Sequence, residues 1–232
     1  MRILRAYKKG GTTIPRTIAV RGTGKCSFAP DTIQLFAEIE RRSKDYEEAL
    51  SLSARAVEQL KSAVVKCGFE ENDLKTSSFN VTTEYESVRD KDGNYKSVFA
   101  GYCVRYNMQL SFGCDTQKLR DVLAAAAKSG ADARLNISFA LESKEEAVDT
   151  ALSLAAEDAK RKAASLAKAM GVGLLKVLSI EQSGVPHNFV SRTEFREDAV
   201  AARMMNAKSS IADIAPHDID IEESVSAVWE IE

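Results

Sequence analysis

Residues 98–112 read VFAGYCVRYNMQLSF, and a hydrophobic side chain stands at almost every second position. This period of two is typical of a β-strand with one buried face. The pattern predicts a long strand with one apolar face, made of Val98, Ala100, Tyr102, Val104, Tyr106, Met108, Leu110 and Phe112. Upstream, residues 79–85 alternate in the same way, and Asp92-Gly93-Asn94 lies between the two runs. The sequence therefore predicts a long β-hairpin.

On both sides of this hairpin the period changes to that of a helix. Hydrophobic residues recur every three or four positions in 43–67, 115–129 and 144–170, and a glycine follows each run. Glycine after the last turn is a common helix stop. We expect three helices, the longest with an inner side made of Val148, Ala151, Leu152, Ala155, Ala159, Leu166 and Met170.

Five shorter alternating runs predict further strands, at 16–24, 33–40, 135–141, 175–182 and 219–231. Hairpins and helical crossovers are mixed along the chain, which is typical of the α+β class. We expect a mixed, largely antiparallel sheet with about three helices on one face, built from two strand–helix–strand units plus the long hairpin. Residues 1–15 are predicted to be a flexible tail, and 16–232 one domain with a long mobile loop at 183–216.

The composition excludes several classes of protein. The 232 residues carry a formal net charge of −2, which disfavours a dedicated nucleic-acid binder. No segment has the ~18 apolar residues of a membrane span, and the basic start lacks the apolar core of a secretory signal. The four cysteines form no C-x-x-C pair. We expect four free thiols and a cytoplasmic location, or export if a leader has been removed.

Several segments together resemble the SIMPL-domain family. They include Arg21-Gly22-Thr23-Gly24, Asp73-Leu74-Lys75-Thr76-Ser77-Ser78-Phe79, Gly101-Tyr102 with Asn107, and the closing strand from Val225 to Trp229. The resemblance spans about 17–231 and implies a domain of unknown function. Bacterial members include oxidative-stress-defence and periplasmic immunogenic proteins, and an animal relative is named for association with a Pelle-like kinase. The family has no established catalytic motif to carry over.

Two loops imitate ligand-binding motifs. Gly22-Thr23-Gly24-Lys25 is followed by Cys26 rather than Ser or Thr, and a strand rather than a helix comes next, which disfavours a phosphate loop. Asp90-Lys91-Asp92-Gly93-Asn94 has its glycine at the fourth position of a calcium loop instead of the sixth. We therefore expect no cofactor, and the sparse histidines and cysteines predict no metal site.

A nucleophilic cysteine would need a base, and His187 and His217 are the two histidines of the chain. A hydrolase or redox enzyme that pairs Cys103 with His187, or Cys67 with His217, is thus an alternative that the spacing does not support. Tyrosines of the hairpin could line a pocket, although aromatic residues on hairpins usually pack across strands.

These observations favour a non-enzymatic binding or assembly protein, with no catalytic, cofactor or metal residues assigned. Long strands leave edges that recruit other chains, so we expect a homo-oligomer through strand edges. Met204 and Met205 add a soft apolar surface and are the predicted partner-binding residues. An adaptor that engages a signalling or stress-response protein through the long loop is a further alternative.

Overall fold

A computed structural model describes residues 15–89, 94–183, 186–193 and 215–232. Within these ranges the strands form one sheet of three strands and one sheet of four, both antiparallel, with three helices. The predicted α+β class is confirmed. The chain divides into two compact units, which are described separately: unit 1 comprises residues 1–27, 143–188 and 220–232, and unit 2 comprises residues 28–142 and 189–219.

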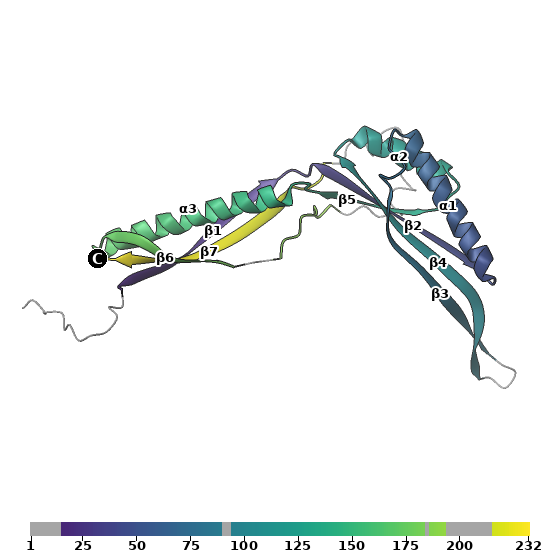
Figure 1. Ribbon diagram of the computed structural model, residues 1–232, viewed down its shortest axis with the longest axis horizontal. Helices are drawn as coiled ribbons and strands as arrows, with labels where there is room; N and C mark the ends of the chain where they lie inside the picture. Colours follow the sequence, from purple (N-terminus) through teal and green to yellow (C-terminus); the bar gives the residue numbers. More distant parts are fainter. Residues whose placement is uncertain (1–14, 90–93, 184–185, 194–214) are drawn as a thin grey trace, which may run out of the picture. The chain divides into compact units, whose positions relative to one another are not determined.

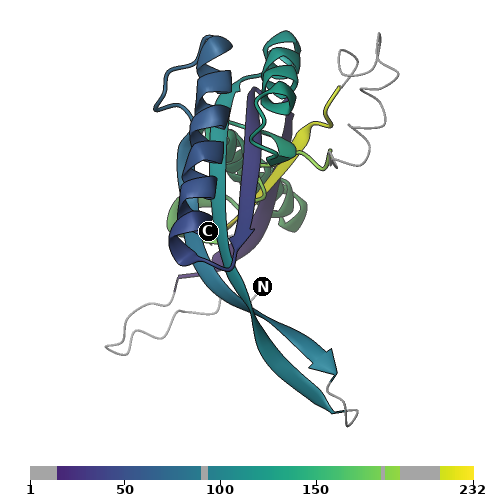
Figure 2. The ribbon, with the colours of Figure 1, turned by 90° about the vertical axis from the view of Figure 1, so that its right-hand side faces the viewer.

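Unit 2 is a four-stranded sheet with two helices on one face. The strand order is β3-β4-β2-β5, with bounds Lys75–Arg89, Tyr95–Gly113, Thr32–Ser43 and Arg134–Ala140. The helices α1 (Tyr46–Lys66) and α2 (Thr116–Lys128) lie side by side over this sheet (Figure 2). Each begins at an aspartate, Asp45 or Asp115, whose carboxylate accepts backbone N–H groups of the first turn.

The core of unit 2 follows from the period of two in β2. Ile33, Leu35, Ala37 and Ile39 are at most 3% exposed, while the alternating Gln34, Phe36, Glu38 and Glu40 are half-buried. The buried side packs with Met108 and Leu110 of β4 and with the inner faces of the two helices. The opposite face of the sheet is consequently polar.

The predicted hairpin is formed by β3 and β4, with one difference from the expected faces. A register shift lies between Glu84, which pairs with Gly101, and Tyr85, which pairs with Phe99. Val98 was expected on the same face as Tyr102. Beyond the shift it is instead the ring of Phe99 that contacts the ring of Tyr102. A one-residue irregularity of this kind reverses the faces of every residue beyond it, and a period of two cannot reveal it.

Unit 1 is a three-stranded sheet with one long helix. The strand order is β1-β7-β6, with bounds Thr17–Phe28, Ile219–Ile231 and Leu174–Ser183, so the strand made last in sequence is the central one (Figure 1). The helix α3 (Lys144–Met170) has a row of six buried alanines, each at most 3% exposed, at 147, 151, 155, 159, 163 and 167.

The expected inner side of α3 was partly wrong. Leu166 and Met170 are 48% and 74% exposed, and the small side chains face the sheet instead. The reason lies in β1, where a Cβ added at Gly22 or Gly24 would come within 2.0 Å of a backbone oxygen of α3. Helix and strand backbones meet so closely that only alanine and glycine fit between them. The Gly22-Thr23-Gly24 sequence is thus explained by packing.

The edge of β1 is protected by charged side chains of α3. The N–H of Thr23 donates to the Asp158 carboxylate at 3.0 Å, and the ammonium of Lys162 donates to the Arg21 carbonyl at 3.0 Å.

In unit 2 the edge of β5 is covered by residues 189–191. The N–H of Ser191 donates to the Phe139 carbonyl, and the N–H of Leu141 donates to the Phe189 carbonyl. Backbone groups that would recruit another strand are satisfied at both places.

The Asp158 carboxyl should give unit 1 an acid-sensitive contact. Hydrogen bonds from Lys162 and from the Thr23 N–H lower its pKa from the ordinary 3.8 to about 2. Because the folded pKa lies below the ordinary value, the contribution is complete above about pH 4 and is lost as the pH falls from 3.8 to 2. We expect Asp158→Asn to flatten the pH dependence of unfolding in that window, measured by fluorescence of Trp229, the one tryptophan of the chain. An unchanged pH profile would contradict this role.

Parts of the sequence-based predictions fall outside the described residues. The tail at 1–14 and most of the loop at 183–216, with Met204 and Met205, lie there. Within the described ranges no helix is long and apolar enough to cross a membrane. One domain over 16–232 stays a prediction.

Candidate functional site

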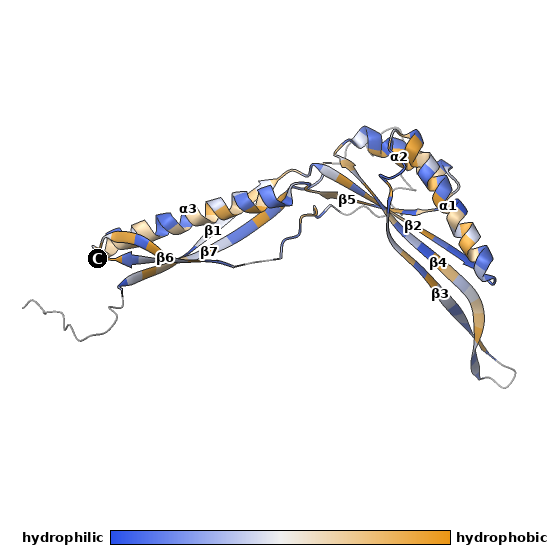
Figure 3. Ribbon diagram, in the orientation of Figure 1, coloured by the Kyte–Doolittle hydropathy of each residue, from blue (hydrophilic) through white to orange (hydrophobic). Residues whose placement is uncertain are grey.

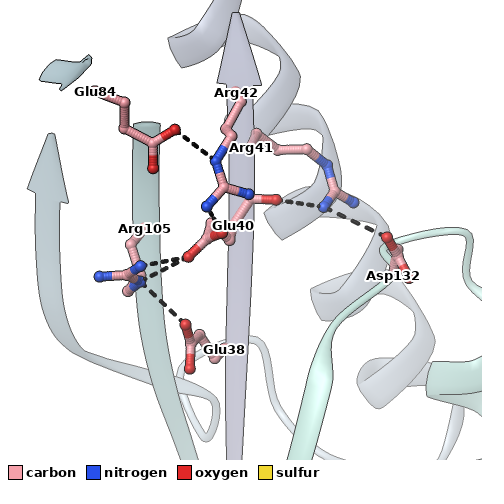
Figure 4. A network of polar contacts seen from close by, with 7 residues as sticks. All are labelled: Glu38, Glu40, Arg41, Arg42, Glu84, Arg105 and Asp132. Carbon is pink, nitrogen blue, oxygen red and sulfur yellow. Dashed lines mark hydrogen bonds and ion pairs between the residues drawn. The ribbon is translucent and has the colours of Figure 1, made fainter. Parts of the chain in front are cut away.

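Ion pairs on the polar face of unit 2 hold the base of the β3–β4 hairpin against β2 (Figure 4). Arg42 of β2 bonds to Glu84 of β3 at 2.7 Å and to Glu40 at 2.6 Å. Arg105 of β4 reaches Glu40 as well as Glu38, the latter at 3.0 Å. Two arginines and three carboxylates therefore connect three neighbouring strands just where β2 ends.

The electrostatics of this network favour the charged forms. The hydrogen bond from Arg105 lowers the pKa of Glu40, and the hydrogen bond from Arg42 lowers the pKa of Glu84. Glu40 is the least exposed partner, with 11% of its side chain accessible. A carboxylate in this position needs its guanidinium partners, and the network therefore fixes the direction in which the hairpin leaves the sheet.

On the opposite side of the hairpin the aromatic rings form a continuous row. Tyr46, at the start of α1, contacts Tyr102, which contacts Phe99, which in turn contacts Tyr85. The ring centroids are 5.3, 5.2 and 6.0 Å apart, all with edge-to-face geometry. The row starts at Tyr46, which is itself 46% exposed, and continues along the hairpin. Such ring contacts stiffen a two-stranded ribbon.

We call residues 85–89 and 95–99, beyond the register shift, the outer hairpin. The hairpin extends past the start of α1, and no helix of the described residues covers its outer part (Figure 2). Tyr85 is 60% exposed, Tyr95 73% and Phe99 41%. The hydrophobic colour of β4 near the hairpin end marks the same region (Figure 3). Exposed apolar surface of this extent on a projecting element is typical of a binding site rather than of a solvated loop.

One side of the outer hairpin is built from three cross-strand pairs. The register pairs Tyr85 with Phe99, Ser87 with Ser97, and Arg89 with Tyr95. Alternate residues of a strand share a face, so these six side chains lie on one side of the ribbon. We call them the aromatic face; it comprises Tyr85, Ser87, Arg89, Tyr95, Ser97 and Phe99.

The two histidines proposed as catalytic bases have other surroundings. In unit 1 the Nε2 atom of His187 lies 2.5 Å from Oε1 of Glu223, whose side chain is 2% exposed. In unit 2 the backbone N–H of His217 donates to the Thr193 hydroxyl, and its carbonyl accepts from Ser191. One partner of the His187 ring is thus a carboxylate.

All four cysteines are free, as the sequence predicts. Burial raises the pKa of Cys26, Cys67, Cys103 and Cys114. Glu40 and Glu84 raise the pKa of Cys103 further. An activated nucleophilic thiol needs the opposite shift.

The raised pKa values predict that the four thiols react slowly at neutral pH. We expect less than one equivalent of iodoacetamide to react with the native protein at pH 7 within minutes, and four equivalents after unfolding, as measured by intact mass. Cys114, the exposed cysteine, should react first. Rapid native labelling of Cys103 or Cys67 at pH 7 would contradict the raised pKa values and favour the thiol-enzyme alternative.

Other kinds of site have little support in the described part of the chain. No group of three or more His, Cys, Asp or Glu side chains is arranged there to hold a metal ion. One surface hollow lies between α1 and α2 and another beside Asp73 and Gln109, so neither is on the outer hairpin.

The sequence predicts this site only in part. It identified the hairpin and its tyrosines, but it assigned partner binding to Met204 and Met205, which lie outside the described residues. It missed the Arg42–Glu84 and Arg105–Glu40 pairs, because which charges meet depends on strand register. The alternation of Glu38 and Glu40 on β2 was the available signal.

The sequence can now be compared with those of known proteins. The family model of SIMPL, a protein of unknown function (DUF541), matches residues 18–229. The chain therefore belongs to the SIMPL family. Its relatives include the 26 kDa periplasmic immunogenic protein of Brucella melitensis biotype 1, 27% identical over 222 residues, and the protein of the same name from Brucella abortus (strain S19), 26% identical. Each alignment covers 95% of this chain and 86% of the relative.

Among solved structures, the regulatory subunit of aspartate kinase from Thermus flavus aligns over 91% of this chain and 90% of its own. The identity is 10% and the TM-score 0.16. A likeness at this level carries no argument about fold or function.

Proposed function

We propose that this protein is a non-enzymatic binding and assembly protein, and that the aromatic face is its protein-binding surface. One observation carries the proposal: Tyr85, Tyr95 and Phe99 are exposed on a hairpin that extends past the start of α1 (Figure 2). Tyrosine and phenylalanine are enriched where proteins meet, since each adds a large, rigid contact area. The ion-pair network at the hairpin base supports the proposal because it holds the surface in a fixed direction.

Photo-crosslinking tests this function directly. A benzophenone amino acid at position 95 should form protein adducts in the cells that make the chain, because the aromatic face is occupied there. The same group at Glu58, an exposed site of α1, is the matched control and should give few adducts. Adducts would be identified by mass spectrometry, with a second copy of the chain counted as a partner. Equal, background-level labelling at both positions would overturn the proposal.

The alternatives named above remain predictions with less support. A hydrolase or redox enzyme that pairs a cysteine with His187 or His217 gains nothing from the raised thiol pKa values. An adaptor for a signalling protein, or a role in stress response, rests on the family resemblance. The aromatic face would suit an adaptor, and the partner in the adduct distinguishes the two roles.

We propose a cytoplasmic location on the strength of the four free thiols, since unpaired cysteines are typical of reducing compartments. The names of the two Brucella relatives are the argument for the periplasm. Cell fractionation followed by immunoblotting decides between them, and recovery in a periplasmic fraction would overturn this part of the proposal.

A further inference from the structure

The edge strand β6 of unit 1 exposes apolar side chains along most of its length. Leu175, Val177, Leu178 and Ile180 are 40% to 67% exposed, although β7 pairs with one side of the strand. We propose that β6 and the adjoining flank of α3 bind peripherally to a membrane surface that contains anionic phospholipids. The strand belongs to unit 1, so this binding role is separate from the one proposed for the aromatic face of unit 2.

The position of α3 explains why these side chains are exposed. The buried alanines of the helix meet the glycines of β1 and pack with Ala227 and Trp229 of β7. Val177 pairs with Trp229, and Ile180 pairs with Ala227. Because directly paired residues share a face of the sheet, Val177 and Ile180 lie on the side that bears α3. They are exposed there because the helix packs on β1 and β7 rather than over this part of β6.

Two lysines of α3 border this apolar strip. The side chains of Asp158 and Lys162 bond to the backbone of β1, which places their row of the helix on the β1 side. Lys160, Ala164 and Lys168 lie one residue past three of the buried alanines, on the opposite side of the buried row and therefore toward β6. Within the described residues, the side chains of Lys160 and Lys168 are exposed and make no ion pair or hydrogen bond. We call these two lysines and the four apolar residues of β6 the β6 flank.

The charge of the surrounding segment is positive. Residues 159–180 contain no aspartate or glutamate, and their five cations are Lys160, Arg161, Lys162, Lys168 and Lys176. Asp158 pairs with Arg161 and Lys162, and Glu230 pairs with Lys176. Lys160 and Lys168 are thus the two cations of the segment that are available to an anion outside the chain.

An anionic lipid surface is complementary to the β6 flank in both charge and polarity. The headgroups attract unpaired lysines, and the boundary between headgroups and acyl chains accepts apolar side chains. An exposed apolar strip of this kind on a folded unit marks a surface that is covered by a partner.

A strand of another protein fits β6 less well. Register shifts lie between Leu174 and Val177 and between Val177 and Ser179. Such irregularities interrupt the ladder that an added strand would continue, and they are a common protection of sheet edges. An added strand would also lie beside β6 and leave the side chains on both of its faces in water. A membrane interface imposes no register and can surround an edge on both faces.

Co-sedimentation of the full chain with lipid vesicles tests this role. We expect binding to phosphatidylcholine vesicles that contain about 30% phosphatidylglycerol, and binding about tenfold weaker to pure phosphatidylcholine, because the lysines then lose their partners. Val177→Asp should weaken binding to the anionic vesicles about tenfold, since it places a carboxylate in the apolar strip. Val65→Asp, at a valine of α1 with the same 44% exposure, is the matched control and should bind as the unchanged protein does. Equal binding of the two variants, or no binding of the unchanged protein, would overturn the inference.

A pair of lysine substitutions tests the electrostatic part. Lys160→Gln/Lys168→Gln should weaken binding to the anionic vesicles about tenfold and leave binding to pure phosphatidylcholine unchanged. Fluorescence of Trp229, which packs under α3, verifies that unit 1 is folded in each variant. Undiminished binding of the lysine variant to anionic vesicles would exclude anionic phospholipid as the partner of this flank.

A fluorescent label identifies the surface that touches the lipid. In a Cys114→Ser background, which removes the exposed native thiol, an environment-sensitive dye at Leu178→Cys should shift its emission to shorter wavelength when anionic vesicles are added. The same dye at Ser62→Cys, an exposed serine of α1, should keep its emission. A shift at both positions, or at neither, would contradict binding through the β6 flank. Crosslinking from position 95 tests the aromatic face independently, so failure of one role leaves the other in place.

Discussion

Replacement of Gly22 by alanine should destabilise unit 1 by about 3–5 kcal/mol, the largest effect that we expect from a single added methyl group. A Cβ at this position would lie 2.0 Å from the carbonyl oxygen of Ala155 and 2.4 Å from the nitrogen of Ala159. Both neighbours are helix backbone and cannot turn away, so α3 would have to separate from β1 along its row of buried alanines. Gly24→Ala should act in the same way, since its Cβ would lie 2.0 Å from the carbonyl oxygen of Ala151.

Urea unfolding followed by Trp229 fluorescence measures this effect in the appropriate unit. Trp229 is 7% exposed and packs with Ala159 and Ala163 of α3, so its emission reports on the affected interface. Gly113→Ala is the matched control, because an added Cβ there has no atom within 4 Å. Because Gly113 belongs to unit 2, this substitution should leave the Trp229 transition of unit 1 unchanged. Equal unfolding midpoints for Gly22→Ala and Gly113→Ala would refute the close packing of α3 on β1.

The second large effect concerns the buried pair of His187 and Glu223. His187→Ala should cost about 3–5 kcal/mol, because it leaves the Glu223 carboxylate buried without its imidazole partner. The other oxygen of Glu223, Oε2, is already buried without a hydrogen bond in the described part of the protein. Loss of the remaining contact would leave the whole group unsatisfied.

The replacement of both residues should be much milder. In His187→Ala/Glu223→Leu the carboxylate is gone and an apolar side chain of similar size fills the space, so most of the stability should return. The same Trp229 unfolding assay compares the single and double variants. A double variant less stable than His187→Ala would show that Glu223 stabilises the fold by contacts other than this pair.

The sequence predicted most elements of the fold because their periodicity is strong and local. Every expected helix and strand is present, and α3 has the expected bounds of Lys144 and Met170. The division of the strands between two sheets was not foreseen, because alternation identifies a buried face but not the strand beside it. The inner side of α3 was misassigned for a related reason: hydrophobic size favours Leu166 over Ala163, and only the glycines of β1 explain the opposite choice.

The candidate site was predictable to a smaller extent. The tyrosines of the hairpin were visible, but the shift at Glu84 and Tyr85 decides which of them share a face with Phe99. The exposure of these tyrosines could not be predicted either, since it depends on where α1 starts relative to the end of the hairpin. Arg42, Glu84 and Arg105 lie far apart in the sequence and become a network through register alone.

The central place of β7 in unit 1 has a consequence for biosynthesis. Neighbours β1 and β6 both pair with a strand that the ribosome makes after all other elements of the unit. Until residues 219–231 leave the ribosome, the sheet lacks its central strand. In that interval the nascent β1, α3 and β6 expose their apolar sides. Unit 2 is largely contained in residues 28–142 and has its strands and helices earlier. Synthesis should therefore yield a folded unit 2 beside an incomplete unit 1, and the nascent chain should depend on chaperones until β7 arrives.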